Sequence, residues 1–127
     1  MAMMKENPEP IPGKLECVSS MKNVTEALYV LGGKWKLPLI LTLLHAPKRF
    51  NEIQAEVTGI SSKVLARELK DLELNEFVRR TVYPTSPPTI LYEATEHSRT
   101  LKNVLHELDL WGGRHRAVIR RSMSRGA

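Results

Sequence analysis

One stretch of the chain carries three basic residues, two hydroxyl residues and an alanine at helical spacing: Lys63, Arg67, Lys70, Ser61, Ser62 and Ala66. Successive residues of an α-helix lie about 100° apart, so the basic residues and the alanine would share one side. Basic side chains bind phosphate oxygens or guanine, hydroxyl groups bond to phosphates or base edges, and alanine leaves room for a thymine methyl. The chemistry that this combination supports is contact with DNA.

The other side of the same stretch is apolar and is formed by Val64, Leu65, Leu69 and Leu72. Ser61 is a suitable N-cap, and no Gly or Pro follows before residue 75. We therefore predict an amphipathic helix over residues 60–72, with an inner apolar face and an outer basic face. A basic helix face is most often plain solvated surface, so the neighbouring elements must decide between the two interpretations.

The chain shows no arrangement typical of catalysis or metal binding. Its four histidines, at positions 45, 97, 106 and 115, lack the spacing of a metal site, since His97 and His106 would face opposite sides of a helix. The acidic residues are scattered, and neither a Gly-rich phosphate loop nor a Ser-His-Asp order is present. We therefore expect no enzyme, no metal and no cofactor.

The length and charge of the chain fit one domain with a polyanionic partner. Its 127 residues are enough to bury a core, and nineteen Lys and Arg against fourteen Asp and Glu give a net charge of +5. Residues 1–98 hold twelve basic and twelve acidic side chains, whereas residues 99–127 hold seven and two. A basic surface before residue 99 must therefore arise from segregation of charges onto one face.

The cellular compartment is indicated by cysteine usage and hydropathy. The single cysteine, Cys17, excludes an intrachain disulfide framework and fits a reducing cytoplasm. The N-terminal residues lack the apolar core of a signal peptide, and the longest apolar run, Leu37–Leu44, is too short to span a bilayer. We expect a cytoplasmic protein that does not enter a membrane.

The first part of the chain divides into an arm and a helix. Residues 1–16 contain three prolines and no periodic pattern, which predicts a flexible arm. From Asn23 the apolar residues recur at helical spacing, and Gly32-Gly33 would stop the helix.

The basic helix is preceded by two further helices. Residues 36–45 are apolar nearly all round, which predicts a central buried helix with Pro38 in its first turn. Residues 49–57 predict a shorter helix that is followed by a turn containing Gly59. A short helix, a tight turn and a longer basic helix form the helix-turn-helix arrangement, whose second member can enter the major groove.

A β-hairpin is expected after the basic helix. The hydropathy alternates over residues 78–83 and 90–94, and a proline-rich polar turn separates the two runs. A hairpin in this place is the layout of a winged helix, although it could also simply cover one end of the core. Arg79 and Arg80 are adjacent on a strand, so their side chains leave on opposite faces and only one of them is expected to meet a phosphate.

A final helix with a long apolar stripe is expected after Thr95, its predicted N-cap. The stripe consists of Leu101, Val104, Leu105, Leu108 and Trp111. Part of so long a stripe would pack against another copy of the chain, or the helix would lie back on its own core. Gly112-Gly113 is expected to end or bend the helix, and the basic tail of residues 112–127 would assist DNA attraction or remain solvated or disordered.

An ordered series of motifs runs through the chain: Gly32–Lys36, Pro47–Ile53, Gly59–Leu65 with Arg67–Glu73, Val78–Pro84 and Leu110–Gly112. This series, which covers about residues 24–111, resembles the HxlR-type family of bacterial transcriptional regulators. The resemblance implies a mainly α-helical winged helix-turn-helix protein with a small β-hairpin, which binds a palindromic double-stranded DNA operator as a homodimer. Members are usually repressors and sometimes activators.

The resemblance also assigns roles to residues. The first and last helices of the family form much of the dimer interface, which implies this set: Val24, Leu28, Leu31, Leu101, Val104, Leu105, Leu108 and Trp111. Together with the reasoning from charge and spacing, it gives the expected DNA-binding set: Ser61, Ser62, Lys63, Ala66, Arg67, Lys70, Arg79, Arg80, Thr85 and Ser86. The expected organisation is an arm (1–16), a winged domain with its dimerisation helices (17–111) and a basic tail (112–127).

A redox role for Cys17 is a further hypothesis, because several members of the family sense electrophiles or oxidants through a cysteine ahead of the first helix. That cysteine usually lies nearer the Gly-Gly-Lys-Trp motif than Cys17 does. The thiolate is the reactive form, and Lys14 and Lys22 would favour it while Glu16 opposes it.

Two alternatives stay open in the sequence. A small-ligand pocket between the dimerising helices, near Trp35 or Trp111, is one of them, although such aromatics are more often core residues. The other is a winged-helix module that binds proteins and does not read DNA, which a gel shift would distinguish.

Overall fold

The computed structural model describes residues 14–126, and the chain divides into two units, residues 1–32 and residues 33–127. Within the described part, the first unit is helix α1 (Lys14–Leu31). The prediction of an arm up to residue 16 and of a helix only from Asn23 was therefore wrong for residues 14–22. That segment lacks a clear apolar period, but it contains no Gly or Pro, so nothing in it prevents a helix from starting early. Residues 1–13 of the predicted arm lie outside the described residues.

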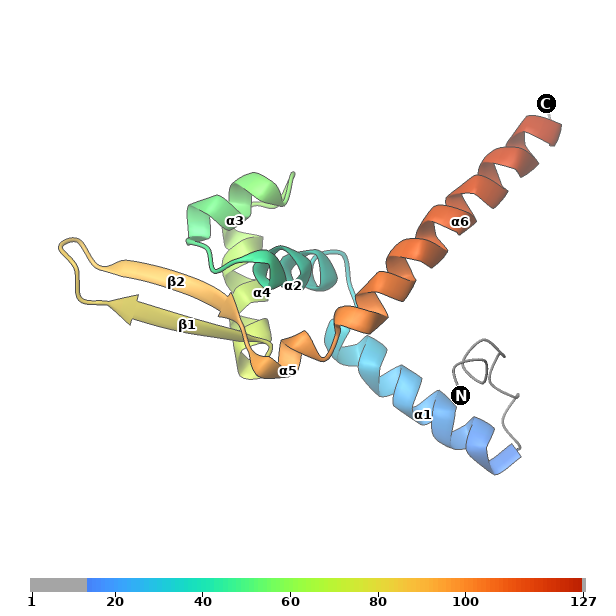
Figure 1. Ribbon diagram of the computed structural model, residues 1–127, viewed down its shortest axis with the longest axis horizontal. Coiled ribbons are helices and arrows are strands. Elements are labelled where there is room, and N and C mark those ends of the chain that lie inside the picture. The colour runs from blue at the N-terminus through green and yellow to red at the C-terminus, as the bar shows by residue number, and fades with distance from the viewer. Residues whose placement is uncertain (1–13, 127) are drawn as a thin grey trace, which may run out of the picture. The chain divides into compact units, whose positions relative to one another are not determined.

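Three helices of the second unit lie together (Figure 1), and their buried side chains form one apolar core. They are α2 (Lys36–His45), α3 (Phe50–Glu56) and α4 (Ser62–Leu74), and their bounds confirm the predicted ones within about two residues. The core residues on these helices are Leu39, Ile40, Leu43, Ile53, Leu65, Leu69 and Leu72. Pro38 lies in the first turn of α2, where its missing amide leaves no intrahelical hydrogen bond unmade.

The turn between α3 and α4 is short and fixed by hydrogen bonds. Gly59 has a φ of 92°, a backbone conformation that side chains disfavour. The Gln54 side-chain amide donates to the Ile60 carbonyl at 3.2 Å and to the Ser62 hydroxyl at 3.0 Å. Because Ile60 is itself buried, the turn is anchored to the core.

A two-stranded antiparallel hairpin follows α4, as predicted. It consists of β1 (Val78–Tyr83) and β2 (Thr89–Ala94), with Arg80 paired with Tyr92 in the register. Lys48 extends this sheet, because its backbone exchanges hydrogen bonds with Tyr92 at 2.8 and 2.9 Å. The hairpin is thereby held on both sides, by β1 to α4 and by β2 to the segment before α3.

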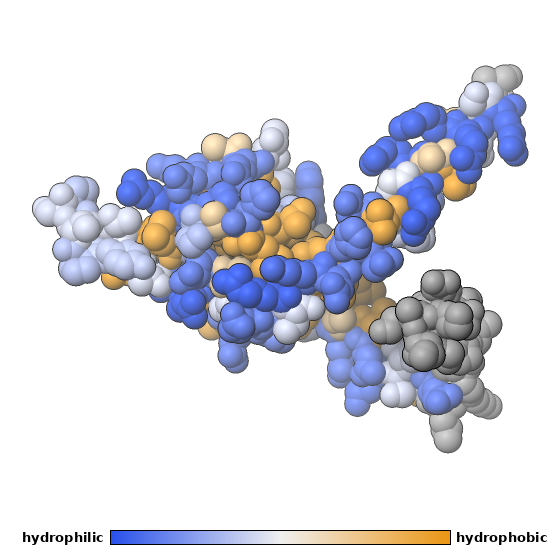
Figure 2. Space-filling model, viewed as in Figure 1, coloured by the Kyte–Doolittle hydropathy of each residue, from blue (hydrophilic) through white to orange (hydrophobic). Residues whose placement is uncertain are grey.

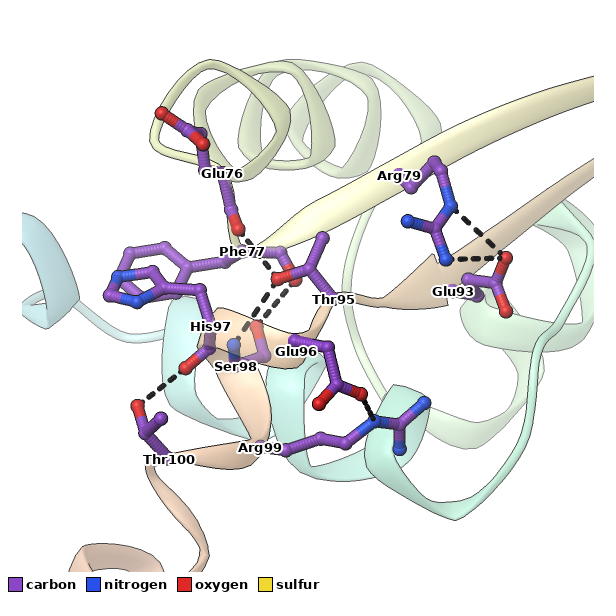
Figure 3. Close-up of polar contacts among 10 residues, drawn as sticks. All are labelled: Glu76, Phe77, Arg79, Glu93, Thr95, Glu96, His97, Ser98, Arg99 and Thr100. Atoms are coloured by element: carbon purple, nitrogen blue, oxygen red, sulfur yellow. Dashed lines mark hydrogen bonds and ion pairs between the residues drawn. The ribbon is translucent and has the colours of Figure 1, made fainter.

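The passage from α4 into β1 is a C-capping motif that α5 (Glu96–Arg99) covers (Figure 3). Glu76 has a φ of 64°, its amide donates to Glu73, and the Phe77 amide donates to Leu72 at 2.8 Å, which is the Schellman pattern. The Thr95 hydroxyl donates to the Glu76 carbonyl at 2.6 Å, and the fully buried Ser98 hydroxyl donates to the Phe77 carbonyl.

The last helix, α6 (Lys102–Gly126), differs from the prediction at both ends. Thr95 caps α5 and not the long helix, because the helix is interrupted at residues 100–101, before α6 begins. Gly112 and Gly113, expected to end or bend the helix, lie inside it, so the expected end there was wrong. Each glycine costs about 1 kcal/mol relative to alanine, and the flanking Leu, Arg and Ala residues are strong helix formers that offset this cost.

Among the described residues, no single helix is long and apolar enough to cross a bilayer. The helices at 16–31 and 36–45 pass such a test of length and composition only when they are counted together.

Candidate nucleic-acid interface

Helix α4 separates its side chains into two faces, as the sequence predicted. Leu65, Leu69 and Leu72 are at most 2% exposed and form part of the core. The exposed side carries the residues expected to meet DNA: Lys63, Ala66, Arg67 and Lys70. Burial of the leucines fixes the rotation of the helix, and the cations therefore cannot turn inward.

The start of α4 is held by its own serines. The Ser61 hydroxyl accepts a hydrogen bond from the Val64 amide at 3.2 Å, which makes it the N-cap. The Ser62 hydroxyl lies 3.0 Å from the Gln54 amide nitrogen. Both side chains are exposed, but both already take part in local hydrogen bonds, so a contact with DNA would have to be shared with these roles.

The cations of α4 differ in how far they are neutralised. Among the described residues, Lys63 forms no ion pair, and Arg67 and Lys70 are 4.0 Å from Glu68 and Glu73, respectively. Both basic side chains are exposed, and a contact of this length with a solvated cation contributes little. The charges of all three side chains therefore remain open to a polyanion.

Glu68 is occupied by a closer partner than Arg67. Lys36, in the first turn of α2, donates from its ammonium group to Glu68 at 2.6 Å, and both side chains are mostly buried. Removal of one member of such a pair leaves the other charge without a partner in a poorly solvated place. The pair therefore stabilises the packing of α4 against α2.

The two hairpin arginines have different surroundings, as the strand alternation predicted. Arg79 is bound to Glu93 at 3.1 Å (Figure 3). Arg80 faces the opposite side of the sheet, where it lines a cleft together with Lys70 and Tyr92 of the neighbouring elements. Arg80, and not Arg79, thus joins the basic face of α4.

The hairpin tip is organised by hydroxyl groups. The Thr85 hydroxyl donates to the Pro87 carbonyl at 2.6 Å and lies 2.8 Å from the Thr89 hydroxyl oxygen, while Ser86 is exposed. A cleft of about 470 Å³ between this tip and the start of α3 is lined by Arg49 and Asn51 among others. The pairing of Lys48 with Tyr92 brings these two residues to the tip. Sequence reasoning missed them, because no local pattern indicates that pairing.

The residues expected at a dimer interface are mostly exposed. Val24 and Leu28 on α1 are exposed and Leu31 is buried, and on α6 the stripe is exposed or half-buried, since no residue of this helix is buried (Figure 2). The sequence missed the rest of the stripe, which continues beyond the glycines with Val118, Ile119 and Met123. Cys17 is exposed on α1.

Two open grooves flank α2. One, of about 790 Å³, lies between α2 and α6 and is lined by leucines together with His45, His106, Lys102 and Asp109. The other, of about 680 Å³, includes Trp35. Trp111 lines neither groove and stacks on His115 with a ring separation of 4.8 Å. Within residues 14–126, no group of three or more His, Cys, Asp or Glu residues is arranged to hold a metal ion.

Comparison with other sequences identifies one matching family and several similar proteins, which are named as transcriptional regulators. Residues 30–119 match the HxlR-like helix-turn-helix family. The HTH-type transcriptional regulator YtcD of Bacillus subtilis is 37% identical over 93 residues, which are 73% of this chain and 74% of YtcD. The HTH-type transcriptional regulator YodB of the same organism is 41% identical over 85 residues, which are 67% of this chain and 76% of YodB.

Solved structures show the same fold. The reduced form of the redox regulator HypR matches with a TM-score of 0.73 at 35% identity, covering 78% of this chain and 98% of HypR. The quinone-bound form of YodB from B. subtilis matches with a TM-score of 0.63 at 35% identity, covering 73% of this chain and 98% of YodB.

Proposed function

The chain belongs to the HxlR-like helix-turn-helix family and is a DNA-binding transcriptional regulator with a winged-helix fold, and we propose that it acts as a homodimer on a palindromic operator. The observation that carries the proposal is the division of α4 into a buried apolar face and an exposed basic face. A helix with this division can lie in the major groove while the hairpin beside it meets the backbone. We assign no catalytic role to any residue, and we expect the protein to act in the cytoplasm.

The proposed homodimer follows from the exposed stripe of α6. A helix whose apolar side chains remain largely solvated gains stability when a second copy covers them. A two-fold dimer would present two α4 helices roughly 34 Å apart, one turn of B-DNA, so that each enters a major groove on the same side of the duplex. A dimer that occupies an operator excludes other proteins from it, so we expect repression.

A direct experiment is to sequence the DNA that co-purifies with the protein from its own cells. We expect an inverted repeat whose half-site centres lie about ten base pairs, or a multiple of this, apart. The affinity for that DNA should fall steeply as the salt concentration rises, because bound phosphates release counterions. A flat salt dependence, or enrichment of no sequence, would contradict the proposal.

Replacing Arg67 by Ala is expected to weaken operator binding by about 1 to 3 kcal/mol if the side chain binds a guanine edge. In that case, specificity relaxes at one base pair, whereas a phosphate contact would weaken all sequences equally. Fluorescence anisotropy with single-substituted operators measures the difference. Arg99→Ala is a matched control, since it removes the same charge from α5, and it should leave the affinity within a factor of about two.

We propose that an electrophile or oxidant acts as the effector through Cys17, whose exposed position on α1 leaves its thiol accessible. Support comes from the similarity to a redox regulator and to a protein solved with a bound quinone. Quinone or diamide treatment is expected to weaken operator binding of the wild type by about 5- to 150-fold, the usual range of allosteric coupling. Cys17→Ser should bind equally with and without the reagent. Equal loss of binding in the variant would show that Cys17 is not the sensor.

A further inference from the structure

We propose that the cleft between α4 and the hairpin binds one backbone phosphate of the DNA through Lys70, Arg80 and Tyr92, and that Glu73 opposes this binding. The inference rests on the proposed binding of an operator by α4. Tyr92 and Glu73 are not among the residues that the sequence indicated for contact with DNA. The cleft has a volume of about 190 Å³ and is lined by Ala66, Leu69, Lys70, Glu73, Arg80 and Tyr92.

The strand alternation brings Arg80 and Tyr92 into this cleft. Val78 and Ala94 are 2% exposed, so the sheet face that contains them is turned towards the core. Arg80 and Tyr92 are the next pair of the register on that same face. Burial of an arginine in the core would cost free energy. Arg80 is exposed, however, because the hairpin extends past the core at this pair and lies beside the outer face of α4.

The charges of the cleft favour an anion. Arg80 has no ion pair among the described residues, and Lys70 has only the 4.0 Å contact with Glu73. Arg79, the other hairpin arginine, is bound to Glu93 on the opposite face of the sheet and does not add its charge to the cleft. Two cations against one carboxylate leave the cleft positive, and hydrogen bonds from cations to phosphate are among the strong ones.

The position of the cleft selects a phosphate over a base. When α4 lies in the major groove of the DNA and the hairpin lies beside it, the sugar-phosphate backbone that separates the major groove from the minor groove must pass between these two elements. The cleft opens at that place. Its volume of about 190 Å³ leaves room for a phosphate group.

Glu73 should weaken this binding. Its carboxylate shares the cleft with Lys70, and it would repel a phosphate held there while it screens the ammonium group. The contact is partly solvated, so salt reduces its effect. The neutral isostere Gln should therefore bind DNA more tightly, with the largest gain at low salt.

The experiment measures affinity against salt for the DNA that co-purifies with the wild-type protein and for a scrambled duplex of equal length. Lys70→Gln and Arg80→Gln should each weaken binding to both duplexes about tenfold. The salt slope should fall by about 0.9 for each phosphate that the variant no longer neutralises, or about 1.8 for a dimer on two half-sites. Tyr92→Phe should weaken both duplexes about threefold without changing the slope, and Glu73→Gln should strengthen binding a few-fold.

The matched control is Arg99→Gln, which removes the same charge from α5, outside the cleft. It should leave the slope unchanged, and circular dichroism checks that each variant is folded. Slopes for Lys70→Gln and Arg80→Gln that equal the control, with a steep slope in the wild type, would overturn the phosphate site and leave DNA binding by α4 intact. A flat slope in the wild type would overturn both.

Discussion

Replacing Leu108 by Glu is expected to lower operator affinity by about 100- to 10,000-fold. Leu108 is 47% exposed in the middle of the α6 stripe, and a carboxylate there would be buried against the second copy without a partner. Dissociation of the dimer removes the gain that comes from two linked binding events, which typically lies in that range. Sedimentation equilibrium measures the dimer, and binding to a full palindrome compared with one half-site measures the consequence for DNA.

The control for this prediction is Leu110→Glu. Leu110 is 41% exposed on the same helix, but two residues turn the side chain by about 200°, so it lies on nearly the opposite side from Leu108. The same substitution there should leave both the dimer and its operator affinity unchanged. If Leu110→Glu separates the copies and Leu108→Glu does not, the dimer uses another face of α6.

The basic helix could be predicted from the sequence because all of its signals are local. Ser61 precedes an apolar period in Leu65, Leu69 and Leu72, and the same period places the cations on the other side. Hairpin strands were equally clear, since alternation and a proline-rich turn lie within a few residues of each other. Patterns of this length determine an element before any tertiary contact is made.

Pairing between distant segments could not be predicted in the same way. The strand register, and the choice of the sheet face that reaches the core, decide the partners of the two arginines. Arg79 binds Glu93 as a result, and Arg80 faces α4. Arg49 comes to the hairpin tip only because Lys48 pairs with Tyr92. These partners are far apart in sequence, and neither residue type indicates the other.

Glycine was a misleading signal in one place and a correct one in another. Gly59 adopts a positive φ in the turn before α4, where the chain must reverse. Gly112 and Gly113 have ordinary helical backbone within α6, where strong helix formers on both sides continue the helix. The difference lies in the flanking residues, and the glycines alone do not reveal it.

Replacing Leu72 by Ala is expected to lower the free energy of unfolding by about 2 to 5 kcal/mol, because the fully buried side chain leaves a cavity that the core fills only in part. Leu74→Ala makes the same change in the same helix, but Leu74 is 69% exposed, so its effect should stay within about 0.5 kcal/mol. Both substitutions lie in the last turn of α4 and make the same chemical change, so the difference between the two in urea denaturation reports mainly burial. Equal losses at the two positions would mean that the leucines of α4 do not fix its rotation, and the outward direction of Lys63, Arg67 and Lys70 would lose its physical cause.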